Sequence, residues 1–475
     1  MVGGGQLARM THQAAIALGQ SLSVLSVSDD DCAALVTPDV QIGQHTDLAA
    51  LRRFGADCDV ITFDHEHVPT EHIRTLAAEG HAVHPGADAL QYAQDKSLMR
   101  ERLAESGIPV PPFEVVPGPG AASPAVHGAD VAIRIAAFGR THGFPVVVKT
   151  ARGGYDGRGV VVVPDLEEAA SAAAQLADSG VLVLEAFVPM RRELAAVIAR
   201  SPFGQAAAWP VVETVQQQGI CVEVIAPAPG LDDDTAAAAT RLALRIAADL
   251  DVVGVLAVEL FQTDRGPGAP DGLLVNELAM RPHNSAHWTM DGAVTSQFEQ
   301  HLRAVLDYPL GRTDAIAPFT VMGNVLGGSS SGPGPAGSAP VESAAESAPV
   351  ESARDQPVMG LDERVHHLAA RFPDVKVHLY GKSFRPGRKL GHVNVIGSDL
   401  GDLRRKARLA ARWLGDGVWP DGYDVHSDVH GDVHGDVHGD VHSDVHGDNQ
   451  IAVDSNAHGL EVEAADARLL AKDVS

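Results

Sequence analysis

The amino-acid sequence predicts an α/β protein with more than one domain. Short apolar runs that read as strands alternate with helix-like segments along most of the chain. The length of 475 residues exceeds one ordinary domain and suggests about three. Hydrophobic residues make up 45% of the chain, which is enough for packed cores. We therefore expect several globular domains built from strands and helices.

The amino-terminal part predicts a parallel sheet. Segments 21–28 and 59–64 read as strands, and residues 47–54 read as part of a helix between them. The opening MVGGGQLARM places a glycine turn before a helix at 6–18, and such a turn offers N–H groups to a phosphate or carboxylate. A strand normally precedes this kind of turn, and only Met1 and Val2 do so here. The sequence therefore predicts that the first strand is missing.

Glu66 follows the strand at 59–64, at the end of a sheet where open α/β folds bind ligands. His65 and His67 flank this carboxylate. They fit a metal pair less well than a pair of exposed loop histidines. Glu66 is thus the candidate substrate contact of the amino-terminal part.

A basic hairpin is predicted at 144–163, FPVVVKTARGGYDGRGVVVV, after a helix within 93–113 and a loop at 117–131. Lys149 ends its first strand. Gly153, Gly154, Gly157 and Gly159 let the backbone approach a phosphate closely. The loop returns into a strand, so it is neither a Walker A loop nor a dinucleotide-binding turn. A mobile tip would explain the glycines, but it leaves the accompanying Arg152, Asp156 and Arg158 unexplained.

Carboxylates mark the strands that follow. Segment 181–201 reads as strand, turn and strand, with Glu185 placed to help read adenine and Glu193 placed to accept ribose hydroxyls; both could also be solvated. A long helix at 232–250 precedes the apolar strands 255–261 and 273–275. These strands carry Glu259 and Glu277, a pair that suits Mg²⁺ shared with phosphate oxygens.

The segment 276–289, NELAMRPHNSAHWT, concentrates polar groups after the second of these strands. Asn276, Glu277, Arg281, His283, Asn284 and His287 are costly to bury without ionic partners. The alternative is a polar strand end with charges placed by chance. We interpret the segment as the place where a metal-bound, highly charged ligand meets a second anionic substrate.

The carboxy-terminal third divides into three parts. Residues 327–356 are rich in Ser, Ala, Pro and Gly and predict a disordered linker. A small compact piece follows, whose basic loop at 382–389 could be a solvated turn but is better interpreted as a contact for an anionic substrate. Residues 424–448 repeat DVH(G/S) and predict a disordered tail, with weak metal capture by its histidines as the alternative.

Composition excludes several classes of function. The net charge of −26 argues against binding to nucleic acid or to an anionic membrane. Three widely spaced cysteines indicate neither a disulfide framework nor a zinc site. No signal peptide or long apolar span is recognised, so a cytoplasmic protein is expected.

The motifs together resemble the 5-(carboxyamino)imidazole ribonucleotide synthase family of ATP-grasp carboxylases in purine biosynthesis. The matching segments span roughly residues 1–420 and include GGGQLARM, FDHEHVP, AQDK, VVVKTARGGYDGRGV, VVETVQQQGI, VNELAMRPHNSAHWT, TSQFEQHLRAVLDYPLG and HLYGKSFRPGRKLGHVNV. The resemblance implies an α+β ATP-grasp fold. Its parts would be a pre-ATP-grasp domain lacking its first strand (1–92), an ATP-grasp domain (93–326), a linker (327–357), a small β-rich domain (358–420) and a tail (421–475).

The resemblance also implies ATP-dependent carboxylation of aminoimidazole ribonucleotide by bicarbonate through carboxyphosphate, with ATP and Mg²⁺ as cofactors and a homodimer as the expected assembly. Metal ligands would be Glu259 and Glu277. Nucleotide contacts would come from Lys149, Gly154, Tyr155, Asp156, Gly157, Gly159, Glu185, Ala186, Phe187, Val188, Glu193, Gln216, Asn276 and Glu277. Catalytic groups would be Arg158, Arg281, His283, Asn284 and Lys382, and the substrates would also meet Glu66, Tyr155, Arg388 and Lys389.

Some positions depart from the family pattern. Gln91 and Tyr92 stand where an ATP-contacting arginine is usual, and Met280 and Ala286 replace the usual Pro and Gly. Other ATP-grasp ligases would share the nucleotide-binding half, and an inactive ATP-binding scaffold would keep the fold. We expect activity because Lys149 and both acidic metal ligands are present.

Overall fold

The computed structural model describes residues 1–117, 128–154, 159–176, 179–328 and 359–423. Four predicted site residues, Tyr155, Asp156, Gly157 and Arg158, lie outside the described residues. So do nearly all of the predicted linker, part of the predicted 117–131 loop and the DVH repeats. None of the helices among the described residues is long and apolar enough to cross a membrane.

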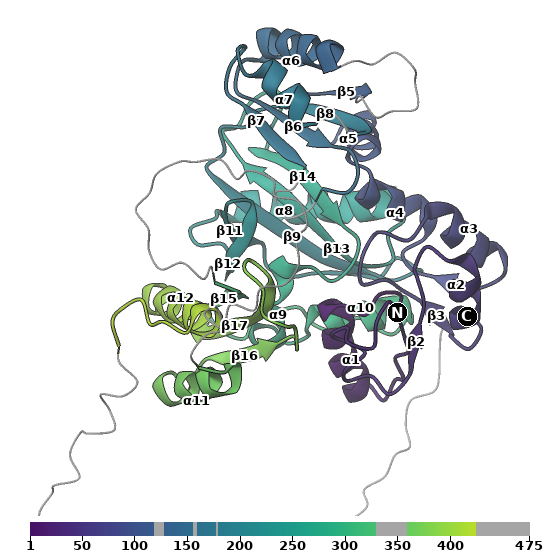
Figure 1. The fold of residues 1–475 in the computed structure, drawn as a ribbon, viewed down its shortest axis with the longest axis vertical. Helices are drawn as coiled ribbons and strands as arrows, with labels where there is room; N and C mark the ends of the chain where they lie inside the picture. Colours follow the sequence, from purple (N-terminus) through teal and green to yellow (C-terminus); the bar gives the residue numbers. More distant parts are fainter. Residues whose placement is uncertain (118–127, 155–158, 177–178, 329–358, 424–475) are drawn as a thin grey trace, which may run out of the picture. The chain divides into compact units, whose positions relative to one another are not determined.

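The amino-terminal part has parallel strand pairs, as predicted (Figure 1). β1 (Val24–Ser26) pairs with β2 (Val40–Ile42), and β3 (Val60–Ile61) pairs with β4 (Ala82–Val83). Helices α1 (Gln6–Ala17), α2 (Leu48–Gly55), α3 (Thr70–Ala78) and α4 (Ala87–Gln94) accompany them.

The predicted absence of a first strand needs correction. Val2 forms parallel bridges to both Leu25 and Phe63 and is fully buried. Its amide donates to Thr62 O at 2.8 Å, and its carbonyl accepts from Asp64 N at 3.1 Å. A minimal first strand therefore joins the two strand pairs and leads directly into the glycine turn.

A second sheet contains four antiparallel strands in the order β5-β8-β6-β7. The strands are β5 (Phe113–Pro117), β6 (Val146–Thr150), β7 (Val160–Val163) and β8 (Val181–Ala186), and the helices α6 (Gly128–His142) and α7 (Ala169–Gln175) pack against them. The predicted basic hairpin is β6–β7, with Lys149 paired to Val160. The helix predicted within 93–113 is α5 (Lys96–Glu105), and it begins where the Asp95 carboxylate accepts from Ser97 N and Leu98 N.

The largest sheet has the order β14-β13-β9-β11-β12-β15-β17-β16, with β10 paired to β9. Its strands are β9 (Arg192–Arg200), β10 (Ala206–Ala208), β11 (Val212–Gln217), β12 (Ile220–Ala226), β13 (Gly254–Gln262), β14 (Leu273–Ala279), β15 (Phe319–Leu326), β16 (Lys376–Leu379) and β17 (Lys389–Gly397). Since β15 pairs with β17, the predicted small domain continues the same sheet.

Helices of this region lie on the faces of the large sheet. α8 (Asp233–Asp249) packs on β9 and β13, and its cap is Asp232, which accepts from Thr235 N. α10 (Gln297–Val305) contacts β13 and α1, while α12 (Leu400–Asp416) covers β15 and β17 and contacts α11 (Leu361–Arg371). A short 3₁₀ turn, η1 (Asn284–Ala286), and α9 (Thr289–Gly292) connect β14 to α10. β14 and β13 form one end of this sheet, and buried side chains of both strands belong to the same core cluster as those of the amino-terminal part.

Candidate active site

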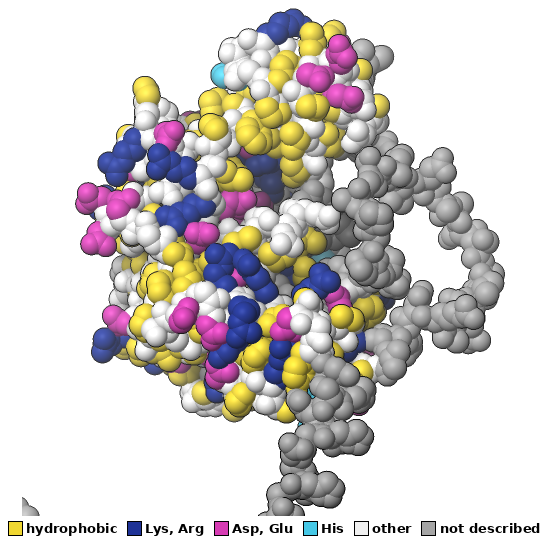
Figure 2. All heavy atoms as spheres, turned by 90° about the vertical axis from the view of Figure 1, so that its left-hand side faces the viewer, with side chains coloured by type: hydrophobic (Ala, Val, Ile, Leu, Met, Phe, Trp, Pro, Cys, Tyr) yellow, Lys and Arg dark blue, Asp and Glu magenta, His cyan; other side chains and the backbone are white. Residues whose placement is uncertain are grey.

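One cavity of about 1070 Å³ brings together the amino-terminal turn, the β6–β7 hairpin and the ends of β13 and β14. The surface is hollowed beneath the four-stranded sheet, and acidic and basic side chains lie in the hollow (Figure 2). Predicted site residues that line the cavity are Glu66, Lys149, Gly154, Glu185, Ala186, Phe187, Val188, Glu193, Gln216, Glu259, Asn276, Glu277, Arg281, His283, Asn284, Lys382 and Lys389. The sequence prediction therefore identified most of the polar wall.

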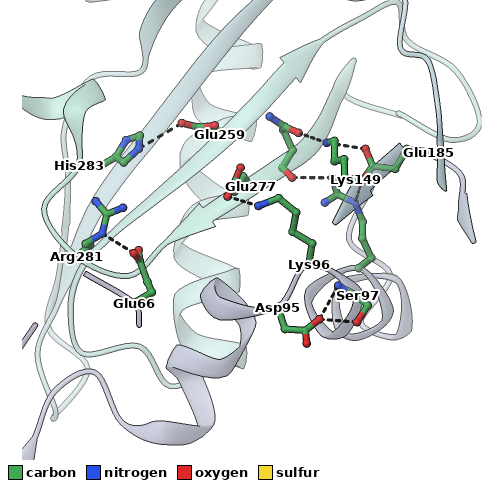
Figure 3. Close-up of polar contacts among 12 residues, drawn as sticks. Glu66, Asp95, Lys96, Ser97, Lys149, Glu185, Glu259, Glu277, Arg281 and His283 are labelled. Atoms are coloured by element: carbon green, nitrogen blue, oxygen red, sulfur yellow. Dashed lines mark hydrogen bonds and ion pairs between the residues drawn. The ribbon is translucent and has the colours of Figure 1, made fainter. Parts of the chain in front are cut away.

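Lys149 projects from β6 into this cavity and is held by two partners (Figure 3). Its Nζ lies 2.8 Å from Glu185 Oε2 and donates to Asn276 Oδ1 at 3.0 Å. The burial of Lys149 lowers its pKa, whereas Glu185 opposes that change. Since its Nζ remains at the cavity wall, Lys149 can present a positive charge to a phosphate.

Arg100, on α5, completes this buried network. Its Nε donates to Glu185 Oε1 and its Nη2 donates to Asn276 O, both at 2.7 Å. Although burial alone would raise it, the pKa of Glu185 falls to about 2 because Arg100 and Lys149 stabilise the carboxylate. The side chain of Glu185 is thus paired with two cations, and its backbone lies between Phe113 of β5 and Val147 of β6.

Glu259 and Glu277 are register partners on the antiparallel strands β13 and β14. Their side chains therefore lie on the same face of the sheet. Lys96 Nζ donates to Glu277 Oε1 at 2.7 Å, whereas Glu259 has His283 Nε2 at 3.4 Å (Figure 3). Burial, followed by the charges of Glu277 and Glu193, raises the pKa of the Glu259 carboxyl.

This arrangement fits a divalent cation. A carboxylate pair with incomplete charge compensation would be stabilised by Mg²⁺, which prefers oxygen ligands. No group of three or more His, Cys, Asp and Glu side chains within the described segments could hold a metal ion. Glu259 and Glu277 would thus supply only part of the coordination, and phosphate and water oxygens the rest.

A second cluster of charged groups includes Arg281, which follows β14, and Glu66 of the amino-terminal part. Arg281 Nε donates to Glu66 Oε2 at 2.8 Å, and the Arg281 pKa is raised by Glu66 against the effect of burial. His283 Nδ1 accepts from Ser285 N, so its Nε2 carries the hydrogen that faces Glu259. Burial lowers the pKa of His283 to about 3, which keeps the imidazole neutral.

Of the predicted site residues that the structure describes, two do not line the cavity. Arg388 lies near it but donates to Ser383 O and Oγ at 3.2 and 2.7 Å. Gly159 ends the hairpin loop with a φ of +72°, and a Cβ there would meet Thr150 Oγ1 at 2.4 Å. Gly159 is therefore explained by the turn itself. Lys382 does line the cavity, where it contacts the side chain of Gln6.

Lys96, Arg100 and His45 are among the residues of the cavity and its wall that the sequence analysis missed. Lys96 belongs to the AQDK motif, which offered a signal that was not used. Gln91, which stands where a nucleotide-binding arginine was expected, donates to Asp88 O within its own helix and does not line the cavity. Lys96, the first residue of α5, is a cation that does line the cavity. His45 and His65 pack with ring centroids 4.6 Å apart, and both line the cavity together with His67. The prediction of exposed loop histidines is correct for His67, which is exposed, whereas His65 in the same loop is half-buried.

The hairpin lysine, the carboxylate pair and the surrounding sheets define an ATP-grasp enzyme. Family models agree: a ribonucleotide synthetase preATP-grasp domain matches residues 1–94, an ATP-grasp domain matches 101–298, and a phosphoribosylaminoimidazole carboxylase C-terminal domain matches 320–406.

The particular family follows from the relatives. The chain is 56% identical over 427 residues to N5-carboxyaminoimidazole ribonucleotide synthase of Mycobacterium tuberculosis, covering 90% of both chains. The corresponding protein of Corynebacterium ammoniagenes is 44% identical over 426 residues, covering 90% of this chain and 94% of that one. The chain belongs to the N5-carboxyaminoimidazole ribonucleotide synthase family and is an ATP-grasp ligase.

Solved structures show the same fold. The synthetase from Thermus thermophilus matches with a TM-score of 0.69 at 34% identity, over 88% of this chain and 99% of that one. The synthase from Aspergillus clavatus in complex with ADP and 5-aminoimidazole ribonucleotide matches with a TM-score of 0.71 at 27% identity, over 88% and 98%.

Proposed function

We propose that the chain carboxylates 5-aminoimidazole ribonucleotide with bicarbonate, in an ATP-dependent reaction of purine biosynthesis that releases ADP and phosphate. The observation that carries this proposal is the joint presence of two anion-binding regions in one cavity. Lys149 and the Glu259–Glu277 pair form one region, and Arg281, Glu66 and Lys382 form the other. ADP and the aminoimidazole ribonucleotide are bound together in the Aspergillus relative.

The first region would position the nucleotide. Lys149 and Lys96 would bring positive charge to the phosphates, and Ala186, Phe187 and Val188, at and just beyond the end of β8, line the same cavity and would contact the base. Mg²⁺ held by Glu259 and Glu277 would neutralise phosphate charge. Phosphoryl transfer needs chiefly positioning and charge neutralisation, and this part of the cavity provides groups for both.

The chemistry proceeds in two steps. A bicarbonate oxygen forms a bond to the γ-phosphorus while the bond to ADP breaks, which gives carboxyphosphate. Carboxyphosphate then releases phosphate and CO₂, and the substrate amine bonds to the CO₂ carbon with loss of a proton. Arg281, neutral His283 and Lys382 surround the space available to the small anion. Because carboxyphosphate hydrolyses readily, a cavity that excludes water favours productive transfer.

Phosphate release tests the proposal directly. The purified chain is incubated with ATP, MgCl₂, bicarbonate and aminoimidazole ribonucleotide, and each component is omitted in turn. We expect release to require the ribonucleotide and to match carboxylated product. Release with a different amine would favour another ATP-grasp ligase, and nucleotide binding without turnover would indicate a scaffold; either result contradicts the proposal. A homodimer remains a prediction from the resemblance, and a cytoplasmic location remains a prediction from the sequence.

A further inference from the structure

Gln297, the first residue of α10, lies directly behind the segment that carries His283 and His287. It is fully buried and does not line the cavity. Its Oε1 accepts from His283 N at 2.7 Å, and its Nε2 donates to His283 O at 2.9 Å. The backbone N–H of Gln297 donates to Thr289 Oγ1 at 2.9 Å, which anchors Gln297 to α9.

These bonds fix the orientation of the Gln297 amide. Because the His283 N–H must meet an oxygen and the His283 carbonyl must meet an N–H, the two ends of the amide cannot be exchanged. The second hydrogen of Nε2 is then directed to His287 Nδ1, 2.8 Å away. His287 Nδ1 is therefore an acceptor, and the ring carries its hydrogen on Nε2.

The residues that Gln297 holds belong to the cavity wall. His283, Asn284, Ser285 and His287 all line the cavity, and His283 faces Glu259 at 3.4 Å. His287 is fully buried and packs against His392 with ring centroids 4.9 Å apart. A change at Gln297 would thus release the His283 backbone and the His287 ring together.

We propose that Gln297 is a positioning residue for the carboxylation reaction: it holds His283 against Glu259 and sets the tautomer of His287. The inference rests on the proposed function, since the positioned groups surround the bicarbonate and ribonucleotide space. Gln297 itself touches neither substrate. A displacement of about 1 Å at such a wall can cost roughly 100-fold in rate.

The same helix offers a matched control. Gln300 is also fully buried, and its Oε1 and Nε2 bracket Gly311 N and O at 2.8 Å each. Neither Gln300 nor Gly311 lines the cavity. Gln297 and Gln300 therefore share residue type, helix, burial and the two side-chain bonds to one backbone residue. They differ in the loop that they hold and in the additional bond from Gln297 to His287.

The test compares Gln297→Glu and Gln297→Met with Gln300→Glu and Gln300→Met in the full chain. The measurements are melting temperature, kcat, KM for ATP, and ADP formed per carboxylated product. We expect the Gln297 and Gln300 variants with the same substitution to have similar melting temperatures. Only the Gln297 variants should show at least a tenfold lower kcat and an excess of ADP over carboxylated product, and their KM for ATP should change little. A misplaced wall should let carboxyphosphate hydrolyse before transfer.

Equal kinetics for the Gln297 and Gln300 pairs would overturn the inference. If both Gln297 variants fail to fold while the Gln300 variants fold, Gln297 supports the fold and the inference is also wrong. The wild-type chain separates this claim from the proposed function. If the wild-type chain shows no ribonucleotide-dependent turnover, the proposed function and the role of Gln297 are both wrong. If the wild-type chain turns over normally and the Gln297 variants have the same kinetics as the Gln300 variants, only the role of Gln297 is wrong.

Discussion

Glu259 and Glu277 lie directly opposite each other on β13 and β14. Two carboxylates on one sheet face repel each other unless a cation or a proton compensates them. Lys96 compensates Glu277. Burial, followed by the charges of Glu277 and Glu193, raises the pKa of Glu259 to about 8. The sheet thus holds a carboxylate that favours either a proton or a metal ion.

The first prediction concerns the pH dependence of stability. The pKa of Glu259 is higher in the folded chain than its ordinary value of 4.5, so its contribution to stability is complete below pH 4.5 and is lost as pH rises toward 8. Glu259→Gln should therefore remove part of the decline in melting temperature measured in EDTA over this range. Mg²⁺ should raise the melting temperature of wild type more than that of the variant. Glu299→Gln, outside the cavity, is the control, and equal Mg²⁺ effects in all three proteins would contradict the prediction.

The second prediction concerns Glu185. Its pKa is lowered to about 2 in the folded chain, so its stabilisation is present above pH 4.5 and is lost as pH falls through about 2. Glu185→Gln leaves Arg100 and Lys149 without their shared carboxylate and should cost about 3 kcal/mol in the free energy of unfolding at pH 7. Denaturant unfolding measures this change. Glu79→Gln breaks the exposed pair with Arg52 and should have little effect; equal losses would refute the account of the buried network.

The third prediction concerns Lys149. Lys149→Met removes the cavity charge that the proposed function assigns to the phosphates, so KM for ATP should rise at least tenfold, which corresponds to about 1.4 kcal/mol. Initial rates at varied ATP concentration measure the effect. Lys406→Met removes a surface lysine paired with Asp374 and serves as the control. An unchanged KM for ATP in the Lys149 variant would show that the hairpin lysine does not bind the nucleotide.

The fourth prediction distinguishes Lys96 from Gln91. Lys96 lines the cavity and pairs with Glu277, whereas Gln91 bonds within its own helix. Lys96→Met should weaken the binding of ADP several-fold, and Gln91→Ala should leave it unchanged. Calorimetric titration with ADP and Mg²⁺ measures both. Weaker binding by the Gln91 variant alone would return the missing nucleotide contact to that position.

Sequence patterns predicted the groups that motifs place on strands. Lys149, Glu259 and Glu277 were recognisable because an apolar run that carries a charged residue is unusual. The sequence analysis grouped the two glutamates because each lies on an apolar strand, but the antiparallel pairing of β13 with β14 that places them opposite each other depends on tertiary structure. The same motifs, taken together, also predicted the family and its function.

Contacts between distant segments could not be predicted in this way. Arg100 resembles any other charged residue in a helix until α5 packs against β8 and β14. The two residues before the glycine turn are too few to be recognised as a strand from sequence, although Val2 forms parallel bridges to Leu25 and Phe63. His45 and His65 are far apart in sequence, and only the folded sheet brings their rings together at the cavity.

The most direct test of the account is ribonucleotide-dependent phosphate release by Glu259→Gln and Glu277→Gln, measured with saturating ATP, Mg²⁺ and bicarbonate beside wild type and Glu299→Gln. Both cavity variants should remain folded and lose at least about 100-fold in kcat, a loss of the size seen when one charge-stabilising group is removed. Wild-type turnover by either cavity variant would contradict the account.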